Sequence, residues 1–200
     1  IIYIKINKHF LSMKIFITLI FLIFSLQSWT KADDIKEFEI EGISIGDHLL
    51  SHFTKSQVQN SNKNTYPKSN KFVGVEIRLS NYEKYKFVQI HYDNDFIIHS
   101  VAGAVFYRDI EECYSQQSKI KNQFESLFTD FKIYDDTMVH EQDPSGKSYG
   151  RSVEFSLKTG DALIHCTDWS EEFEKKGYGD NLRIEISTKE FSDFLRYEAY

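Results

Sequence analysis

The spacing of apolar residues predicts one long central helix. From Asp109 to Tyr134, apolar side chains recur every three or four positions, which is the period of one helix face. The residues of this stripe are Ile110, Cys113, Gln117, Ile120, Phe124, Leu127, Phe128 and Phe131. Asp109 can cap the start of the helix, and Glu112 three residues later completes a capping-box pattern.

Strand-like runs, in which apolar and polar residues alternate, lie on both sides of this helix. Three precede it (73–79, 85–92 and 96–107) and three follow it (151–158, 162–167 and 181–187). Gly103 lies inside the third run, where a bulge or a close backbone contact is the usual reason for a glycine.

Shorter helices are expected before and after these runs. Asp47 can cap a helix through Phe53, Thr54 with Gln57 can cap a second one, and Ser187 with Glu190 can cap a final amphipathic helix. The polar segment 60–70 is typical of a loop. The predicted order is therefore helix, three strands, helix, three strands, helix. This order indicates an α+β fold in which one or two antiparallel sheets pack on helices.

The two sets of strands also share a faint sequence similarity. Residues 75–79 read Val-Glu-Ile-Arg-Leu, and residues 153–157 read Val-Glu-Phe-Ser-Leu. A duplicated unit of one helix and three strands would explain this similarity, and so would chance alternation.

Residues 1–32 have the pattern of a secretory leader. Ile1 to Ser12 precede Met13 and are interpreted as upstream sequence. Met13-Lys14 is followed by an apolar run from Ile15 to Leu26 and by the small-residue frame Thr30-Lys31-Ala32. The run is shorter than the roughly 20 residues that span a bilayer, so cleavage after Ala32 is favoured over a retained anchor. We therefore expect one α+β domain over residues 33–200, located in the periplasm or secreted.

The charge of the mature chain disfavours two classes of partner. The leader contains four of the 24 basic residues and none of the 30 acidic residues, so 20 basic groups remain against 30 acidic ones. This acidic balance argues against nucleic acid and anionic membrane surfaces as partners. No stable membrane span is expected after cleavage.

A short motif provides a resemblance to known proteins. The entry Gly42-Ile43-Ser44-Ile45-Gly46-Asp47, together with the helix that begins at Asp109, resembles exported proteins of unknown function from AT-rich bacteria. The Gly-Ile-Ser entry into a first helix is also similar to small envelope proteins of the BamE/SmpA type, which help assemble outer-membrane proteins. The likeness implies a style of fold and transfers no site residue, because the lipid-bearing Cys of that group is missing.

Two histidines are candidate metal ligands. His48 and His52 lie four residues apart on a predicted helix, so both imidazoles can face one way, as in some zinc and copper sites. The alternative is a polar face on a short helix. A metal-dependent hydrolase would use this pair.

Other motifs have ordinary structural explanations. Gly146-Lys147-Ser148 mimics the end of a phosphate-binding loop, but Glu141 stands where that loop needs its first Gly. His91 and His165 fit buried or sheet-face positions, and the sequence contains neither a G-x-S-x-G nor an H-E-x-x-H motif. No cofactor is implied.

The two cysteines of the chain, Cys113 and Cys166, are predicted to form a disulfide. Cys113 lies on the apolar stripe of the central helix, and Cys166 alternates with Ala162 and Ile164 on the apolar face of its strand. These two surfaces meet in an α+β layer, and exported proteins reach an oxidising compartment.

The features together favour a non-enzymatic binding or interaction protein of the cell envelope, with another envelope protein as its partner. The alternatives are the metal-dependent hydrolase and a binder of small ligands on the aromatic sheet face.

Overall fold

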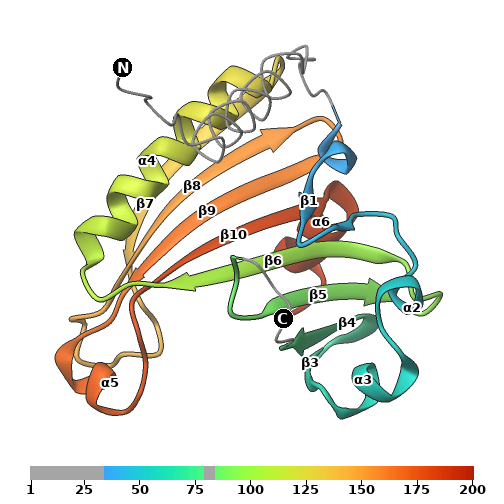
Figure 1. Cartoon of the computed structure of the whole chain (residues 1–200), viewed down its shortest axis with the longest axis horizontal. Coiled ribbons are helices and arrows are strands. Elements are labelled where there is room, and N and C mark those ends of the chain that lie inside the picture. Colours follow the sequence, from blue (N-terminus) through green and yellow to red (C-terminus); the bar gives the residue numbers. More distant parts are fainter. Residues whose placement is uncertain (1–33, 79–83) are drawn as a thin grey trace, which may run out of the picture. The chain divides into compact units, whose positions relative to one another are not determined.

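A computed structural model describes residues 34–78 and 84–200, which belong to one compact unit. The main feature is an eight-stranded sheet with the order β3-β4-β5-β6-β10-β9-β8-β7, in which every neighbouring pair is antiparallel (Figure 1). Its strands are β3 (Asn62–Tyr66), β4 (Ser69–Ile77), β5 (Val88–Asp93), β6 (Ile98–Phe106), β7 (Phe131–Val139), β8 (Tyr149–Leu157), β9 (Gly160–Asp168) and β10 (Asn181–Thr188). A separate two-stranded sheet pairs β1 (Glu39–Ile40) with β2 (Ile43–Ser44).

Helices are few and mostly short. They are the 3-10 helix η1 (Ile35–Glu37) and the α-helices α2 (Leu49–His52), α3 (Lys55–Asn60), α4 (Ile110–Leu127), α5 (Glu171–Lys175) and α6 (Lys189–Tyr197). No helix in the described residues is long and apolar enough to cross a membrane.

The predicted α+β class and its alternating element order are wrong. The protein is mostly antiparallel sheet, and the large sheet is continuous, with β6 paired to β10 at its centre. The expected order of helices and three-stranded groups, with its suggested duplication, therefore does not describe this fold.

Two strands of the large sheet, β3 and β7, were missed, and both lie at its edges. β3 lies within the predicted loop 60–70. Four of its five residues are exposed, so its sequence has no alternation of apolar and polar residues that would predict a strand. β7 includes Phe131 to Tyr134, which the sequence assigned to the long helix. Phe131 fits the helical spacing of the stripe, yet it also alternates with Ile133. The helix in fact ends at Leu127, and the backbone of Phe128 is already extended.

The two faces of the sheet carry different elements. α4 lies on one face, where Cys113 is joined to Cys166 of β9. α6 lies on the opposite face, where Ser192 hydrogen-bonds Ser187 of β10. Most of the apolar core is on the α4 side, because alternate residues of every central strand point there. The buried strand residues of this core include Val75, Ile77, Val88, Ile90, Val101, Val153, Phe155, Ala162, Ile164, Leu182 and Ile186.

The start of α2 differs from the predicted cap. His48, not Asp47, is the N-cap residue, and its Nδ1 accepts a hydrogen bond of 3.2 Å from the Leu50 backbone N–H. Asp47 instead accepts from the Ser44 backbone N–H. Asp109 caps α4 as predicted, accepting from Glu111 N–H at 3.0 Å.

Candidate functional site

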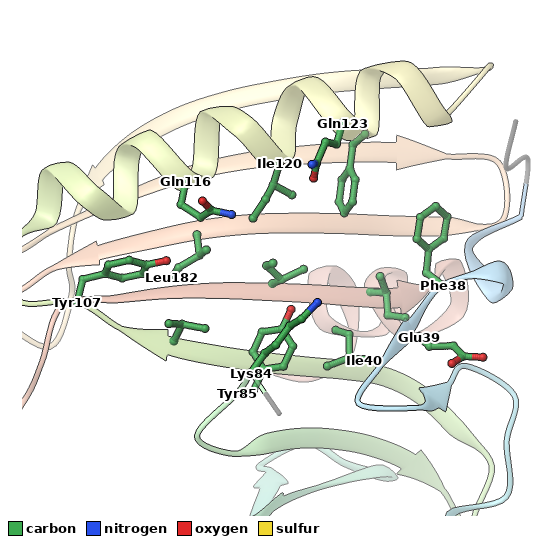
Figure 2. Close-up of a pocket in the computed structure, with 14 residues that line it drawn as sticks. Phe38, Glu39, Ile40, Lys84, Tyr85, Tyr107, Gln116, Ile120, Gln123 and Leu182 are labelled. Carbon is green, nitrogen blue, oxygen red and sulfur yellow. The ribbon is translucent and has the colours of Figure 1, made fainter. Parts of the chain in front are cut away.

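A groove of about 320 Å³ lies between α4 and the face of the sheet beneath it (Figure 2). This volume is at the lower end of the range for small-molecule sites. The residues that line it are Phe38, Glu39, Ile40, Lys84, Tyr85, Val105, Tyr107, Gln116, Ile120, Gln123, Phe124, Leu182, Ile184 and Ile186. We refer to it below as the α4 groove.

Strands β6 and β10 form the floor of the α4 groove. Leu182, Ile184 and Ile186 alternate along β10, so all three project to the same face. Leu182 lies directly opposite Val105 of β6, which adds a fourth aliphatic side chain. The floor is therefore apolar over its whole length.

One wall is a single stripe of α4. Gln116, Ile120, Gln123 and Phe124 are spaced by three and four residues, so they share one helix face. Ile120 is buried, whereas the two glutamines are more exposed and bring amide groups to the groove (Figure 2). The side-chain amides of Gln116 and Gln123 make no hydrogen bond to another described residue.

The opposite wall depends on a glycine. The ring of Tyr85 lies directly over Gly103, because a Cβ at that position would stand only 2.5 Å from Tyr85 Cδ1. The carboxylate of Glu41 fixes the backbone of this segment by accepting hydrogen bonds from the N–H groups of Lys84 (2.9 Å) and Tyr85 (3.2 Å). Of the two explanations expected for Gly103, a bulge or a close contact with its backbone, the structure shows a close contact, made by the ring of Tyr85.

Two tyrosine hydroxyls at this site remain protonated at neutral pH. Burial raises the pKa of Tyr85, and the nearby charge of Glu41 raises it further. Burial also raises the pKa of Tyr107, with a contribution from Glu112. Both hydroxyls are therefore available as hydrogen-bond donors.

A cluster of aromatic rings lies at the Phe38 end of the groove. Phe38 contacts Phe124 and Phe128 of the helix, with ring centroids 5.9 Å and 5.1 Å apart. Phe155 of β8, which is fully buried, touches both helix rings. These contacts attach β1 to the C-terminal end of α4.

The disulfide holds the other end of α4. Cys113 and Cys166 are bonded with an Sγ–Sγ distance of 1.99 Å, as the sequence predicted, and both are fully buried. Gln117, one turn further along, donates through Nε2 to the carbonyls of Arg151 (2.8 Å) and Ile164 (3.0 Å). These bonds fix α4 to β8 and β9. The α4 groove lies on the side of the helix that faces β10.

The candidate metal ligands have local partners. His52 Nε2 lies 2.8 Å from Asp47 Oδ2, and the His48 ring stacks on Phe96 at 5.9 Å between centroids. Within residues 34–78 and 84–200, no three His, Cys, Asp or Glu side chains are grouped to hold a metal ion. Metal binding by His48 and His52 stays a prediction.

The opposite face of the sheet carries polar groups that the sequence did not connect. His99 lies between Asp93 Oδ2 (3.2 Å from Nε2) and Thr188 Oγ1 (3.1 Å from Nδ1). Because Thr188 also caps α6 by accepting from Phe191 N–H, this set ties a turn to a helix. A second pair joins Ser152 Oγ to His165 Nδ1 at 2.7 Å across neighbouring strands.

Arg183 and Glu185 form the centre of this polar face. Glu185 accepts from Arg183 at 2.9 Å and from Ser100 at 2.7 Å, and Arg183 also donates to Gln89 at 2.6 Å. His91 lies beside them, 6% exposed, with its ring over Gly74 and its Nδ1 without a hydrogen-bond partner. Burial lowers the pKa of His91 to about 4, so the imidazole is neutral.

Comparison of the chain with protein-family models, curated proteins and solved structures finds no match. The resemblance to BamE/SmpA-type proteins therefore stays a prediction.

Sequence reasoning missed most residues of this groove. It placed Ile120 and Phe124 on the apolar stripe, but not the polar residues beside them. Gln116 and Gln123 are seven residues apart, a spacing that returns to the same helix face. That spacing was a usable signal, whereas the approach of Tyr85 and Phe38 depends on tertiary structure.

Proposed function

We propose that this chain is an exported, non-enzymatic binding protein that holds a small amphipathic molecule in the α4 groove. The observation that carries the proposal is the combination of an apolar floor with polar groups on the walls. Leu182, Ile184 and Val105 can take the apolar part of a ligand, and the amides of Gln116 and Gln123, which bond no other described residue, line the same groove. Small-ligand sites are commonly mostly apolar, with a few placed polar groups.

Export is part of the proposal. A buried disulfide is typical of proteins that mature in an oxidising compartment, which agrees with the leader pattern of residues 1–32. The leader lies outside the described residues, so its test is chemical. Mass spectrometry of the periplasmic or secreted product should find Asp33 at the N-terminus. A full-length chain retained in the membrane would contradict export by cleavage.

Binding can be tested with a fluorescent apolar probe, N-phenyl-1-naphthylamine, added to the protein of residues 33–200. We expect saturable fluorescence enhancement from the wild-type protein. Gln123→Trp places a larger side chain in the wall from an exposed helix position, so folding should be preserved. Steric obstruction of about 1–3 kcal/mol corresponds to roughly a five- to 150-fold loss of probe affinity.

Asn122→Trp is the matched control. Asn122 is the adjacent exposed residue of α4 and does not line the groove. The control should bind the probe like the wild type. Equal binding by all three proteins, each with an unchanged melting temperature, would place the probe elsewhere and contradict the proposal.

A metal-dependent hydrolase in which His48 and His52 hold a zinc ion is the second candidate. Zinc measurement on purified protein decides it. About one equivalent of zinc, lost in a His48→Ala/His52→Ala variant, would support this candidate. No retained zinc in the wild-type protein would remove it.

A further inference from the structure

The polar groups around the α4 groove include five that can donate hydrogen bonds. They are the ammonium of Lys84, the hydroxyls of Tyr85 and Tyr107, and the amides of Gln116 and Gln123. Figure 2 shows these side chains reaching toward the groove from its two sides. A ligand group that only accepts hydrogen bonds would suit such a set.

Lys84 supplies the positive charge among the residues that line the groove. Among the described residues, no carboxylate lies within ion-pair distance of its Nζ. An unpaired cation beside an apolar floor favours an anionic ligand group.

Two of the acidic residues near the groove, Glu39 and Glu41, direct their carboxylates away from its floor or toward backbone groups. Glu39 lines the groove at the far end, and its carboxylate points away from the floor in Figure 2. Glu41 directs one carboxylate oxygen at the backbone N–H groups of Lys84 and Tyr85.

We infer that the ligand is an amphiphile with one carboxylate head and an unbranched apolar tail. The head accepts from the Lys84 ammonium, and the tail lies along Leu182, Ile184 and Ile186. The stretch of α4 from Gln116 to Phe124 is about 12 Å long, which sets the scale of the tail. This inference rests on the proposed function, since it assigns the ligand class of the same groove.

Three ten-carbon amphiphiles that differ in head group test the inference. The affinities of decanoate, 1-decanol and decyltrimethylammonium are measured by displacement of N-phenyl-1-naphthylamine, below their micelle concentrations. For the wild-type protein, decanoate should bind about five- to tenfold more tightly than decanol, and the cation most weakly. Lys84→Gln should remove the advantage of decanoate and leave decanol unchanged, and Lys84→Arg should keep most of it.

Lys86→Gln is the charge-matched control. Lys86 is exposed, lies two residues away and does not line the groove, so its loss should leave all three affinities unchanged. Equal binding of decanoate and decanol, or the same effect from Lys84→Gln and Lys86→Gln, would overturn the carboxylate assignment while leaving the groove as a binding site. Failure of all three amphiphiles to displace the probe would overturn the proposed function as well.

Discussion

Three aromatic rings lie directly over glycines, and one of them, Tyr85, forms a wall of the α4 groove. Tyr85 lies over Gly103, His91 over Gly74 and His165 over Gly150. In each case a Cβ on the glycine would stand within 2.7 Å of the ring. The absence of a side chain therefore determines where a ring can lie on the sheet.

Gly103→Ala should displace the Tyr85 ring and narrow or distort the α4 groove. We expect a loss of about 1–3 kcal/mol in the free energy of unfolding, because the added methyl group overpacks the site. Urea unfolding measures this loss. In a Tyr85→Ala background, where the clash is absent, the same substitution should have little effect. An equal loss in both backgrounds would mean that Gly103 is needed for another reason.

His91 should make stability depend on pH between about 4 and 6.5. Its folded-state pKa is lowered to about 4 by burial, with Glu185 opposing the shift and Arg183 adding to it. The unfolded chain therefore binds more protons in this window, so stability is complete above pH 6.5 and falls as the pH is lowered toward 4. The loss attributable to His91 is on the order of 3 kcal/mol.

The measurement compares wild-type protein with His91→Phe by urea unfolding at pH 7, 6, 5 and 4.5. Phenylalanine keeps a ring over Gly74 and removes the nitrogen that has no partner. The variant should lose less stability on acidification than the wild type does. Identical pH profiles would show that His91 does not titrate in this window.

At the scale of the element, α4 was the most successful prediction and also the source of one error. The sequence predicts the period of α4, its Asp109 cap and the face on which Cys113 lies. A 3.6-residue stripe over five turns is a strong signal. The end of α4 was not readable, because Phe131 fits both the helix stripe and the alternation of β7. Only pairing with β8 decides between the two.

The disulfide is expected to stabilise the attachment of α4 to β9. Cys113 and Cys166 are 53 residues apart, and closing a loop of that length contributes roughly 4 kcal/mol in the chain-entropy model. The Cys113→Ala/Cys166→Ala variant should lose stability of that order in urea unfolding. Because α4 forms a wall of the groove, the variant should also bind the probe more weakly.

Thiol counting on unreduced, denatured protein provides an independent check of the bridge. The expected result is no free thiol. Two free thiols per chain would contradict the disulfide and remove this explanation of how the helix is held.

At the scale of the whole molecule, the strands with an apolar face were predicted and the exposed edges were not. The six central strands alternate clearly enough to be found, but β3 and most of β7 are exposed and have no buried face to detect. The joining of β6 to β10, which makes one sheet, depends on contacts between residues about 80 positions apart. No local pattern reports such pairing.

This long-range pairing is also what creates the α4 groove. Its floor exists because Val105 and Leu182 come side by side, and its walls come from β1, the segment before β5, and α4. Sequence reasoning therefore could name the small-ligand alternative and some apolar wall residues, but not the site itself.

Methyl-resolved NMR can locate a ligand bound between α4 and the sheet. N-phenyl-1-naphthylamine is titrated into protein labelled at isoleucine and leucine methyl groups. We expect the methyl signals of Ile120 and Ile184, which line the groove, to shift with one common dissociation constant, and the signals of Leu163, on the opposite face of β9, to stay unchanged. Shifts centred on Leu163, or saturable binding without any change at Ile120 and Ile184, would contradict binding in the α4 groove.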